Sequence, residues 1–256
     1  MDDFLKIKMR NTILLNEIYK MDSSFYEEGI IAILIKGAAL ILKGYIRFCE
    51  REMSDVDVVV RERDYDKVVR ILEKKGFDEI KDGRHAYYRG VGDMFAPVIF
   101  DVHSYFSNLK FDDIEFEDLD DCKAFKLPSD SDLLIITAVH SVIKHGFFDD
   151  RCLKDFRMIY ENAKKKSSDF EKYVMDKACR YKVSYILYLS FLKAGISIKK
   201  PGLSFKEFLS IPFVDLAFRY HLKLNEYIVP FFYEFGMVKD KLKRTLDFFK
   251  NTYYTM

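Results

Sequence analysis

The residues whose spacing best fits a reaction site are two aspartates, Asp55 and Asp57, at the start of an apolar run. That run, residues 56–60, predicts a buried strand. Because alternate side chains of a strand share one face, both carboxylates point the same way. Two carboxylates about 4 Å apart repel by about 4 kcal/mol at an effective dielectric near 20, so they need a proton, an arginine or a metal ion nearby. Mg²⁺ fits best because it binds one or two carboxylates together with substrate phosphates.

A third carboxylate, Asp101, lies in a second predicted strand over residues 98–105. Its neighbours Phe100 and Val102 are apolar, and an acid between apolar residues indicates a function. If this strand pairs beside the first, Asp101 completes a metal site with the two aspartates. His103 shares a strand face with Asp101 and is predicted to contact substrate or metal, with a hydrogen-bonded core histidine as the alternative.

A strand-to-helix turn upstream, Lys36-Gly37-Ala38, is the candidate phosphate site. Residues 30–35 are apolar and rich in branched side chains, which predicts a buried strand, and a helix is predicted from residue 38 towards residue 45. Backbone amides at a helix start can receive phosphate oxygens, and glycine permits close approach. The alternative is an ordinary turn, where glycine is also common.

Further elements must position these segments. Helix-period spacing predicts a helix over residues 5–18, and Asp64 and Gly76 are typical of the start and end of another. The first half therefore mixes helices and strands. Its end is marked by the acidic residues 112–121, which predict a solvated link.

Beyond residue 125 the helical patterns stand alone. Three serines, each followed three residues later by an acid, are typical of capping boxes that open helices: Ser129, Ser168 and Ser204. We predict an α+β fold with a mixed sheet and flanking helices in residues 1–125, followed by an all-helical domain in residues 126–256.

Composition limits the protein class. The chain has 256 residues, of which 49% are hydrophobic, enough for a sizeable core. Its net charge of +1 gives no long-range field to hold nucleic acid or anionic lipid. We expect no membrane span and a cytoplasmic protein, because no apolar run reaches about 18 residues and the N-terminus lacks a signal pattern. The four cysteines are too far apart in sequence for a zinc or redox motif.

The order strand, Lys36-Gly37, helix, Ser54-Asp55-Val56-Asp57, helix and Asp101-Val102-His103 resembles the polymerase β-type nucleotidyltransferase superfamily, in its small uncharacterised bacterial and archaeal branch. The resemblance covers residues 30–105. It implies that paired acids bind two Mg²⁺ ions, with Mn²⁺ as the alternative ion, and that a third acid completes the site and helps deprotonate an acceptor. These roles would belong to Asp55 with Asp57 and to Asp101, and Gly37 would hold a nucleoside triphosphate.

One departure concerns the turn, where most of that superfamily has serine after glycine and this chain has Ala38. Lys36 is predicted to compensate for the missing hydroxyl. Arg51 is predicted to contact phosphate or brace Asp55, with a surface arginine beside Glu50 and Glu52 as the alternative. The predicted cofactor-binding set is Lys36, Gly37, Ala38, Arg51, Ser54 and His103, and the predicted catalytic and metal set is Asp55, Asp57 and Asp101.

The predicted activity is therefore transfer of a nucleoside monophosphate from a nucleoside triphosphate to a hydroxyl, with release of pyrophosphate. Two alternatives stay open: an antitoxin-like nucleotide-binding module with weak catalysis, and kinase-like transfer of the terminal phosphate. The sequence does not fix the acceptor, which can be a small molecule, a protein or a nucleic acid end. It does not fix the oligomeric state either, and a homodimer is one alternative. Four residues have no assigned role: His85, His140, Lys144 and His145.

Overall fold

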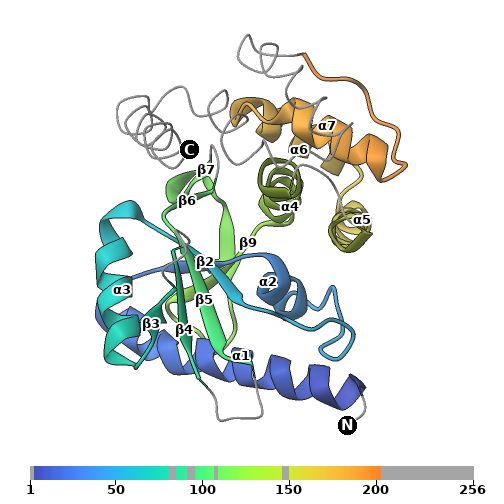
Figure 1. Ribbon diagram of the computed structural model, residues 1–256. Helices are drawn as coiled ribbons and strands as arrows, with labels where there is room; N and C mark the ends of the chain where they lie inside the picture. Colours follow the sequence, from blue (N-terminus) through green and yellow to red (C-terminus); the bar gives the residue numbers. More distant parts are fainter. Residues whose placement is uncertain (1–2, 81–84, 91–95, 107–108, 146–149, 203–256) are drawn as a thin grey trace, which may run out of the picture.

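The computed structural model describes residues 3–80, 85–90, 96–106, 109–145 and 150–202 (Figure 1). Its centre is a seven-stranded mixed sheet in the order β3-β4-β5-β2-β1-β9-β8. The strands are β1 (Ala32–Leu34), β2 (Val56–Val60), β3 (Asp78–Glu79), β4 (Ala86–Arg89), β5 (Val98–His103), β8 (Phe116–Asp118) and β9 (Phe125–Pro128). A separate hairpin joins β6 (Tyr105–Phe106) to β7 (Leu109–Lys110).

Helices cover both sides of this sheet. They are α1 (Asp3–Glu27), α2 (Lys36–Leu42), α3 (Tyr65–Lys74), α4 (Asp130–His145), α5 (Asp150–Lys166), α6 (Phe170–Arg180) and α7 (Ser184–Lys193), with short 3-10 turns at Glu62–Asp64 and Phe111–Asp113. In Figure 1, α1 and α3 lie along the lower and left side of the sheet, whereas α2 and the group α4 to α7 lie to its right and above. The predicted α+β class with a mixed sheet, flanking helices and helices after it is confirmed. Among the described residues, no helix has the length and apolarity needed to span a bilayer.

The central strand β2 decides the arrangement of the sheet. All five of its residues are buried, and β1 pairs with it antiparallel on one side while β5 pairs with it parallel on the other. A strand covered on both faces reads as a continuous apolar run rather than an alternating one. The single polar residue in this run, Asp57, lies directly opposite Asp101 of β5.

Several predicted elements need correction at their ends. The first helix continues to Glu27, nine residues past the predicted end at residue 18, and Asp22 near its end accepts hydrogen bonds from the backbone amides of residues 123–125. The acidic stretch predicted as a solvated link contributes β8, whose three residues are exposed and which pairs with β9 at the edge of the sheet. Charged residues are common on edge strands because they discourage pairing with other chains.

The helix starts show mixed outcomes. Ser129 caps α4 as predicted, since its hydroxyl accepts from the amide of Asp132 and donates to that carboxylate. Ser168 does not cap α6, which begins at Phe170 after Asp169. Ser204 lies outside the described residues. Because β9 ends at Pro128, the sheet extends three residues beyond the domain boundary predicted at residue 125, and the two-domain division stays a prediction.

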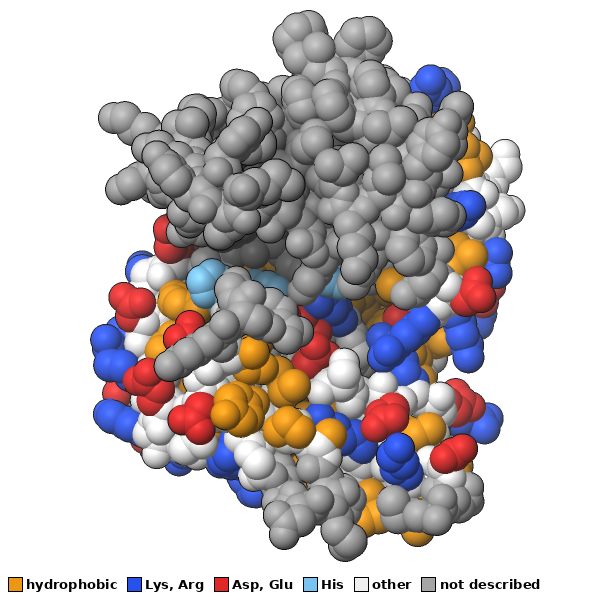
Figure 2. Space-filling view, in the orientation of Figure 1, with side chains coloured by type: hydrophobic (Ala, Val, Ile, Leu, Met, Phe, Trp, Pro, Cys, Tyr) orange, Lys and Arg blue, Asp and Glu red, His pale blue; other side chains and the backbone are white. Residues whose placement is uncertain are grey.

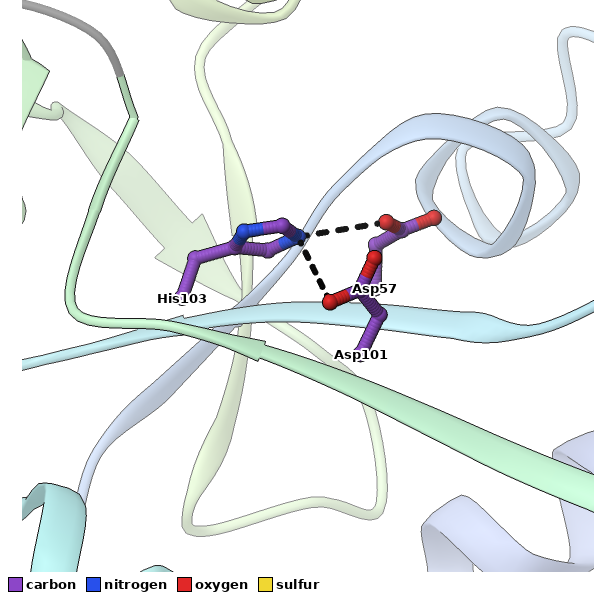
Figure 3. Close-up of side chains that lie close together, drawn as sticks. All are labelled: Asp57, Asp101 and His103. Carbon is purple, nitrogen blue, oxygen red and sulfur yellow. Dashed lines mark hydrogen bonds and ion pairs between the residues drawn. The ribbon is translucent and has the colours of Figure 1, made fainter. Parts of the chain in front are cut away.

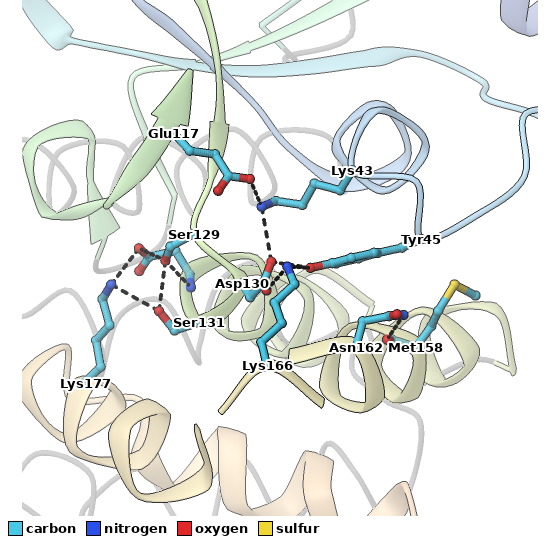
Figure 4. A network of polar contacts seen from close by, with 11 residues as sticks. Lys43, Tyr45, Glu117, Ser129, Asp130, Ser131, Met158, Asn162, Lys166 and Lys177 are labelled. Carbon is cyan, nitrogen blue, oxygen red and sulfur yellow. Dashed lines mark hydrogen bonds and ion pairs between the residues drawn. The ribbon is translucent and has the colours of Figure 1, made fainter. Parts of the chain in front are cut away.

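A network of ion pairs fixes the later helices to the sheet half (Figure 4). Asp130 at the start of α4 lies 3.1 Å from the Lys43 ammonium and 2.8 Å from the Lys166 ammonium, and it also accepts from the Tyr45 hydroxyl, which lies 2.5 Å away. Deeper in the helices, the fully buried Lys177 donates to Asp132 over 2.7 Å. Buried charges of this kind persist only when paired, so the Lys177–Asp132 pair holds α6 against α4. The contacts of Asp130 join α4 to α5 and to the end of α2.

Two buried polar residues of α1 hold the segment between α2 and β2. The Arg10 guanidinium donates to the carbonyls of residues 53, 54, 96 and 97 over 2.6 to 3.3 Å. The Asn11 side chain donates to the carbonyls of Phe48 and Arg51 and accepts from the amide of Met53 over 2.6 to 2.9 Å. Buried backbone groups outside helices and strands need such partners, so α1 replaces the secondary structure that residues 48–54 lack.

We expect Asn11→Ala to lower the free energy of unfolding by about 1–3 kcal/mol, because it leaves buried backbone groups without partners. Urea unfolding followed by circular dichroism measures the change. Thr12→Ala is the matched control on the same helix, since Thr12 is exposed, and should change stability by less than about 0.5 kcal/mol. Equal losses in the two variants would contradict the bracing role of Asn11.

Candidate functional site

The site begins with two carboxylates that adjacent parallel strands hold side by side. Asp57 of β2 and Asp101 of β5 are register partners, and they are 3% and 7% exposed. Neighbouring strands are about 4.8 Å apart, so the two acids share one face of the sheet at close range. Like charges this close in a buried place need a cation or a hydrogen-bond donor to stay ionised.

His103, two residues after Asp101 on the same face of β5, faces both carboxylates (Figure 3). Its Nε2 lies 3.3 Å from Oδ1 of Asp57 and 3.6 Å from Oδ1 of Asp101. One ligand atom from each of the three residues lies within 4.8 Å of the others. Carboxylate oxygens with an imidazole nitrogen form a donor set for a divalent cation, so these residues fit a metal site.

A lysine supplies the positive charge beside these acids. The Lys36 Nζ lies 2.5 Å from Oδ1 of Asp57. Burial opposes ionisation of Asp57, but the Lys36 charge and the His103 hydrogen bond outweigh it and hold the pKa of this carboxyl well below its usual range. Burial likewise opposes the charged form of Lys36, but Asp57 outweighs it and raises the lysine pKa.

The Lys36–Asp57 ion pair stabilises the fold across the neutral range. A carboxyl with a lowered pKa contributes stability above its ordinary pKa and loses it as the pH falls through the lowered value. A lysine with a raised pKa contributes stability below its ordinary pKa and loses it only as the pH rises through the raised value. Between these limits, both groups are charged in the folded state.

Asp55 lies next to this group but outside it. It precedes Val56, the first residue of β2, so the strand ladder does not fix its side chain. Its carboxylate accepts from the Ser54 hydroxyl over 2.7 Å, and burial followed by the charge of Asp57 raises its pKa. The structure therefore brings two of the three predicted acids into one cluster, since Asp101 lies beside Asp57 and His103. Among the described residues, Asp55 is not part of that cluster.

A cavity of about 350 Å³ lies beside the acids, between the sheet half and the helices. The sheet half lines it with Asp55, Asp57, Ser54 and the Lys36-Gly37 turn, and α4 and α5 line the other wall. Figure 2 shows histidine, acidic and basic side chains gathered near the middle of the molecular face in view. The cavity therefore brings both signs of charge to one place.

Arg51 covers Gly37, which lies in the first turn of α2. A Cβ on Gly37 would lie 3.8 Å from Nη2 of Arg51 and 3.4 Å from Cγ of Met53, so the guanidinium lies directly over the turn. Arg51 pairs with the buried Asp155 of α5, and its buried Nε has no hydrogen-bond partner among the residues that the structure describes. Ala38 is only 1% exposed and packs in the core, so its side chain offers nothing to a ligand.

The helical wall contains residues that sequence reasoning missed or left unassigned. Thr137, His140 and Ser141 of α4 line the cavity, as does Arg151 in the first turn of α5. The sequence carried part of this signal, because Thr137, His140 and Ser141 have the i, i+3, i+4 spacing of one helix face within the apolar middle of α4. Arg151, which donates to the carbonyl of Glu52 over 3.1 Å, has no comparable sequence signal.

The remaining histidines are placed elsewhere or are not described. His85 is exposed, and its Nδ1 lies 2.9 Å from the Tyr65 hydroxyl; it is not among the described residues that line the cavity. Lys144 and His145 end α4, and their side chains lie outside the described part of the structure.

Comparison with models of known families gives a match over most of the chain. Residues 2–195 match the model of a family described as uncharacterised nucleotidyltransferase. A comparison with curated proteins finds no match.

Two solved structures are similar at low identity. The solution structure of the antibiotic-resistance factor ANT(2'')-Ia is 11% identical, with 72% of this chain and 98% of that chain covered and a TM-score of 0.46. The crystal structure of an antigenic nucleotidyltransferase-like protein from Paracoccidioides brasiliensis is 17% identical, with 73% and 94% covered and a TM-score of 0.45. These scores are too low for a comparison of sites.

We expect Asp101→Asn to weaken Mn²⁺ binding at least tenfold, because one anionic ligand of the buried cluster is lost. Isothermal titration calorimetry without nucleotide measures this affinity. Asp118→Asn, in the exposed edge strand β8, is the matched control and should bind Mn²⁺ like the unmodified protein. A folded Asp101→Asn protein with unchanged affinity would remove Asp101 from the metal site.

Proposed function

Because the chain belongs to the uncharacterised nucleotidyltransferase family, we propose that it transfers a nucleoside monophosphate from a nucleoside triphosphate to a hydroxyl acceptor and releases pyrophosphate. The observation that carries this proposal is the cluster of Asp57, Asp101 and His103 beside a cavity lined by cations. The cavity volume of about 350 Å³ lies within the usual range of small-molecule pockets, roughly 300–1,000 Å³.

The acids are proposed to hold two divalent ions, Mg²⁺ or Mn²⁺. Asp57, Asp101 and His103 would be the ligands of the cluster, and Asp55 would add a carboxylate from the wall of the cavity. When bound, such ions neutralise the charge that develops on the reacting phosphate and on the attacking and leaving oxygens. The chain needs no covalent nucleophile for this reaction.

The chain's own residues are proposed to position both substrates. Three cations line the cavity and would bind the phosphates: Lys36, Arg51 and Arg151. Their contacts would replace the hydrogen bond of the serine hydroxyl that is missing after Gly37. Asp101 would accept the proton as the acceptor oxygen bonds to the α-phosphorus and the bond from that phosphorus to the pyrophosphate oxygen breaks. Holding the reacting groups in line supplies much of the rate enhancement in such a site.

Labelled substrates test the reaction directly. Purified protein is incubated with α-labelled or γ-labelled ATP, Mg²⁺ and three kinds of acceptor: small polyhydroxy compounds, RNA ends and the protein's own hydroxyls. We expect α label on an acceptor and release of pyrophosphate. We also expect at least a hundredfold loss of rate in Asp57→Asn, because an ionised metal ligand is removed, and an unchanged rate in Asp118→Asn.

The other outcomes decide against the proposal. A γ label on the acceptor would identify a kinase-like reaction. Nucleotide binding without any transfer would identify a binding module. Transfer that persists in Asp55→Asn and Asp57→Asn would place the reaction elsewhere in the chain.

We expect Arg151→Met to weaken binding of a non-hydrolysable triphosphate analogue about tenfold or more, because a charged hydrogen bond to phosphate contributes about 1.5–3 kcal/mol. Fluorescence titration in the presence of Mg²⁺ measures the affinity. Lys154→Met is the matched control, since Lys154 is an exposed cation of the same helix that does not line the cavity. Equal affinities in the two variants would remove Arg151 from the phosphate site.

A further inference from the structure

One carboxylate oxygen of the Asp57, Asp101 and His103 cluster has two polar contacts. Oδ1 of Asp57 lies 2.5 Å from the Lys36 ammonium and 3.3 Å from Nε2 of His103. A bound Mg²⁺ lies roughly 2.0–2.1 Å from a carboxylate oxygen and also demands space for its other ligands. An ammonium group and a divalent ion therefore compete for this oxygen.

The backbone holds Lys36 in a place suited to this competition. Lys36 is the first residue of α2 and has a φ of +54°, a left-handed conformation that non-glycine residues rarely adopt. Such conformations persist only where the surrounding structure maintains them, and they are frequent at functional sites. The side chain is 17% exposed and also lines the cavity, so the same ammonium borders both the acids and the proposed phosphate site.

We propose that Lys36 is a built-in counter-ion of Asp57, which a divalent metal displaces and which then binds the phosphates of the nucleotide. This inference rests on the proposed function, because it concerns the same metal and triphosphate. The flexible four-carbon stem lets the ammonium move without movement of the backbone. Once the metal is bound, repulsion between the two cations favours a position of Lys36 away from Asp57 and towards an anion.

The consequence is a coupling between the two ligands. Without metal, the carboxylate of Asp57 holds the Lys36 ammonium, so the phosphates lose one contact. With metal, the ammonium is released to them. Metal and nucleotide each therefore improve the binding of the other, as linkage requires of two ligands that favour the same arrangement.

The test measures Mn²⁺ affinity without nucleotide in three variants. We expect Lys36→Met to bind Mn²⁺ at least tenfold more tightly, because the competing cation is removed, and Lys36→Arg to stay within about threefold of the unmodified protein. Arg151→Met is the charge-matched control, since it removes a cavity cation that does not contact Asp57, and should change the affinity by less than about threefold. Unchanged or weaker binding in Lys36→Met, or an equal gain in Arg151→Met, would overturn the proposal.

A second measurement uses the nucleotide. At saturating Mn²⁺, we expect Lys36→Met to bind a non-hydrolysable triphosphate analogue at least tenfold more weakly, although it binds the metal more tightly. A lysine with only a structural role would not shift the two affinities in opposite directions. Two shifts of the same sign would overturn the proposal.

The unmodified protein gives an independent readout if a variant does not fold. In ¹⁵N-lysine spectra, the ammonium signal of a paired lysine reports its partner. We expect the Lys36 signal to move on addition of Mg²⁺ alone, and an unmoved signal at saturating metal would overturn the proposal. None of these readouts needs turnover, so a protein that shows them without transferring label keeps this inference and loses the proposed function.

Discussion

The in-register parallel pairing of β2 with β5 is the constraint on which the site depends. It places Asp57 opposite Asp101 in a part of the sheet where the rest of β2 is valine. A slip of one residue would turn Asp57 into the buried packing on the other face of the sheet and Val58 to the site, so the acid itself disfavours the slip. The fold must then offset the repulsion between the acids, and Lys36 and His103 supply the compensating charge and hydrogen bonds.

The site also depends on contacts far from its chemistry. The segment between α2 and β2 carries Arg51 and Asp55 but has little secondary structure of its own, and Arg10 and Asn11 of α1 satisfy its backbone. The pair between Arg51 and Asp155 then ties this segment to α5. Each wall of the cavity is thus positioned by side chains from an element distant in sequence.

The parts of the fold that local patterns encode were predictable. The valine run predicted β2 with both ends correct, and the strand predicted over residues 98–105 contains β5, which ends at His103. The edge strand β8 was not predictable, because its three exposed residues have no apolar periodicity and form a strand by pairing with β9. In the site, the aspartates were visible as motifs, whereas Asp155 becomes relevant through its pair with Arg51, 104 residues away, which no local spacing discloses.

The absence of a hydroxyl after Gly37 becomes intelligible from the balance of charge in the cavity. Two acids that line the cavity are each paired with a cation: Asp57 with Lys36, and Asp155 with Arg51. A metal-bound triphosphate brings charges of both signs, so it can exchange partners with these pairs, cation to carboxylate and phosphate to ammonium or guanidinium. Charged donors form stronger hydrogen bonds to phosphate than a hydroxyl does. Under the proposed function, Lys36 and Arg51 would supply the phosphate contacts at this turn without a serine, and Ala38 packs in the core.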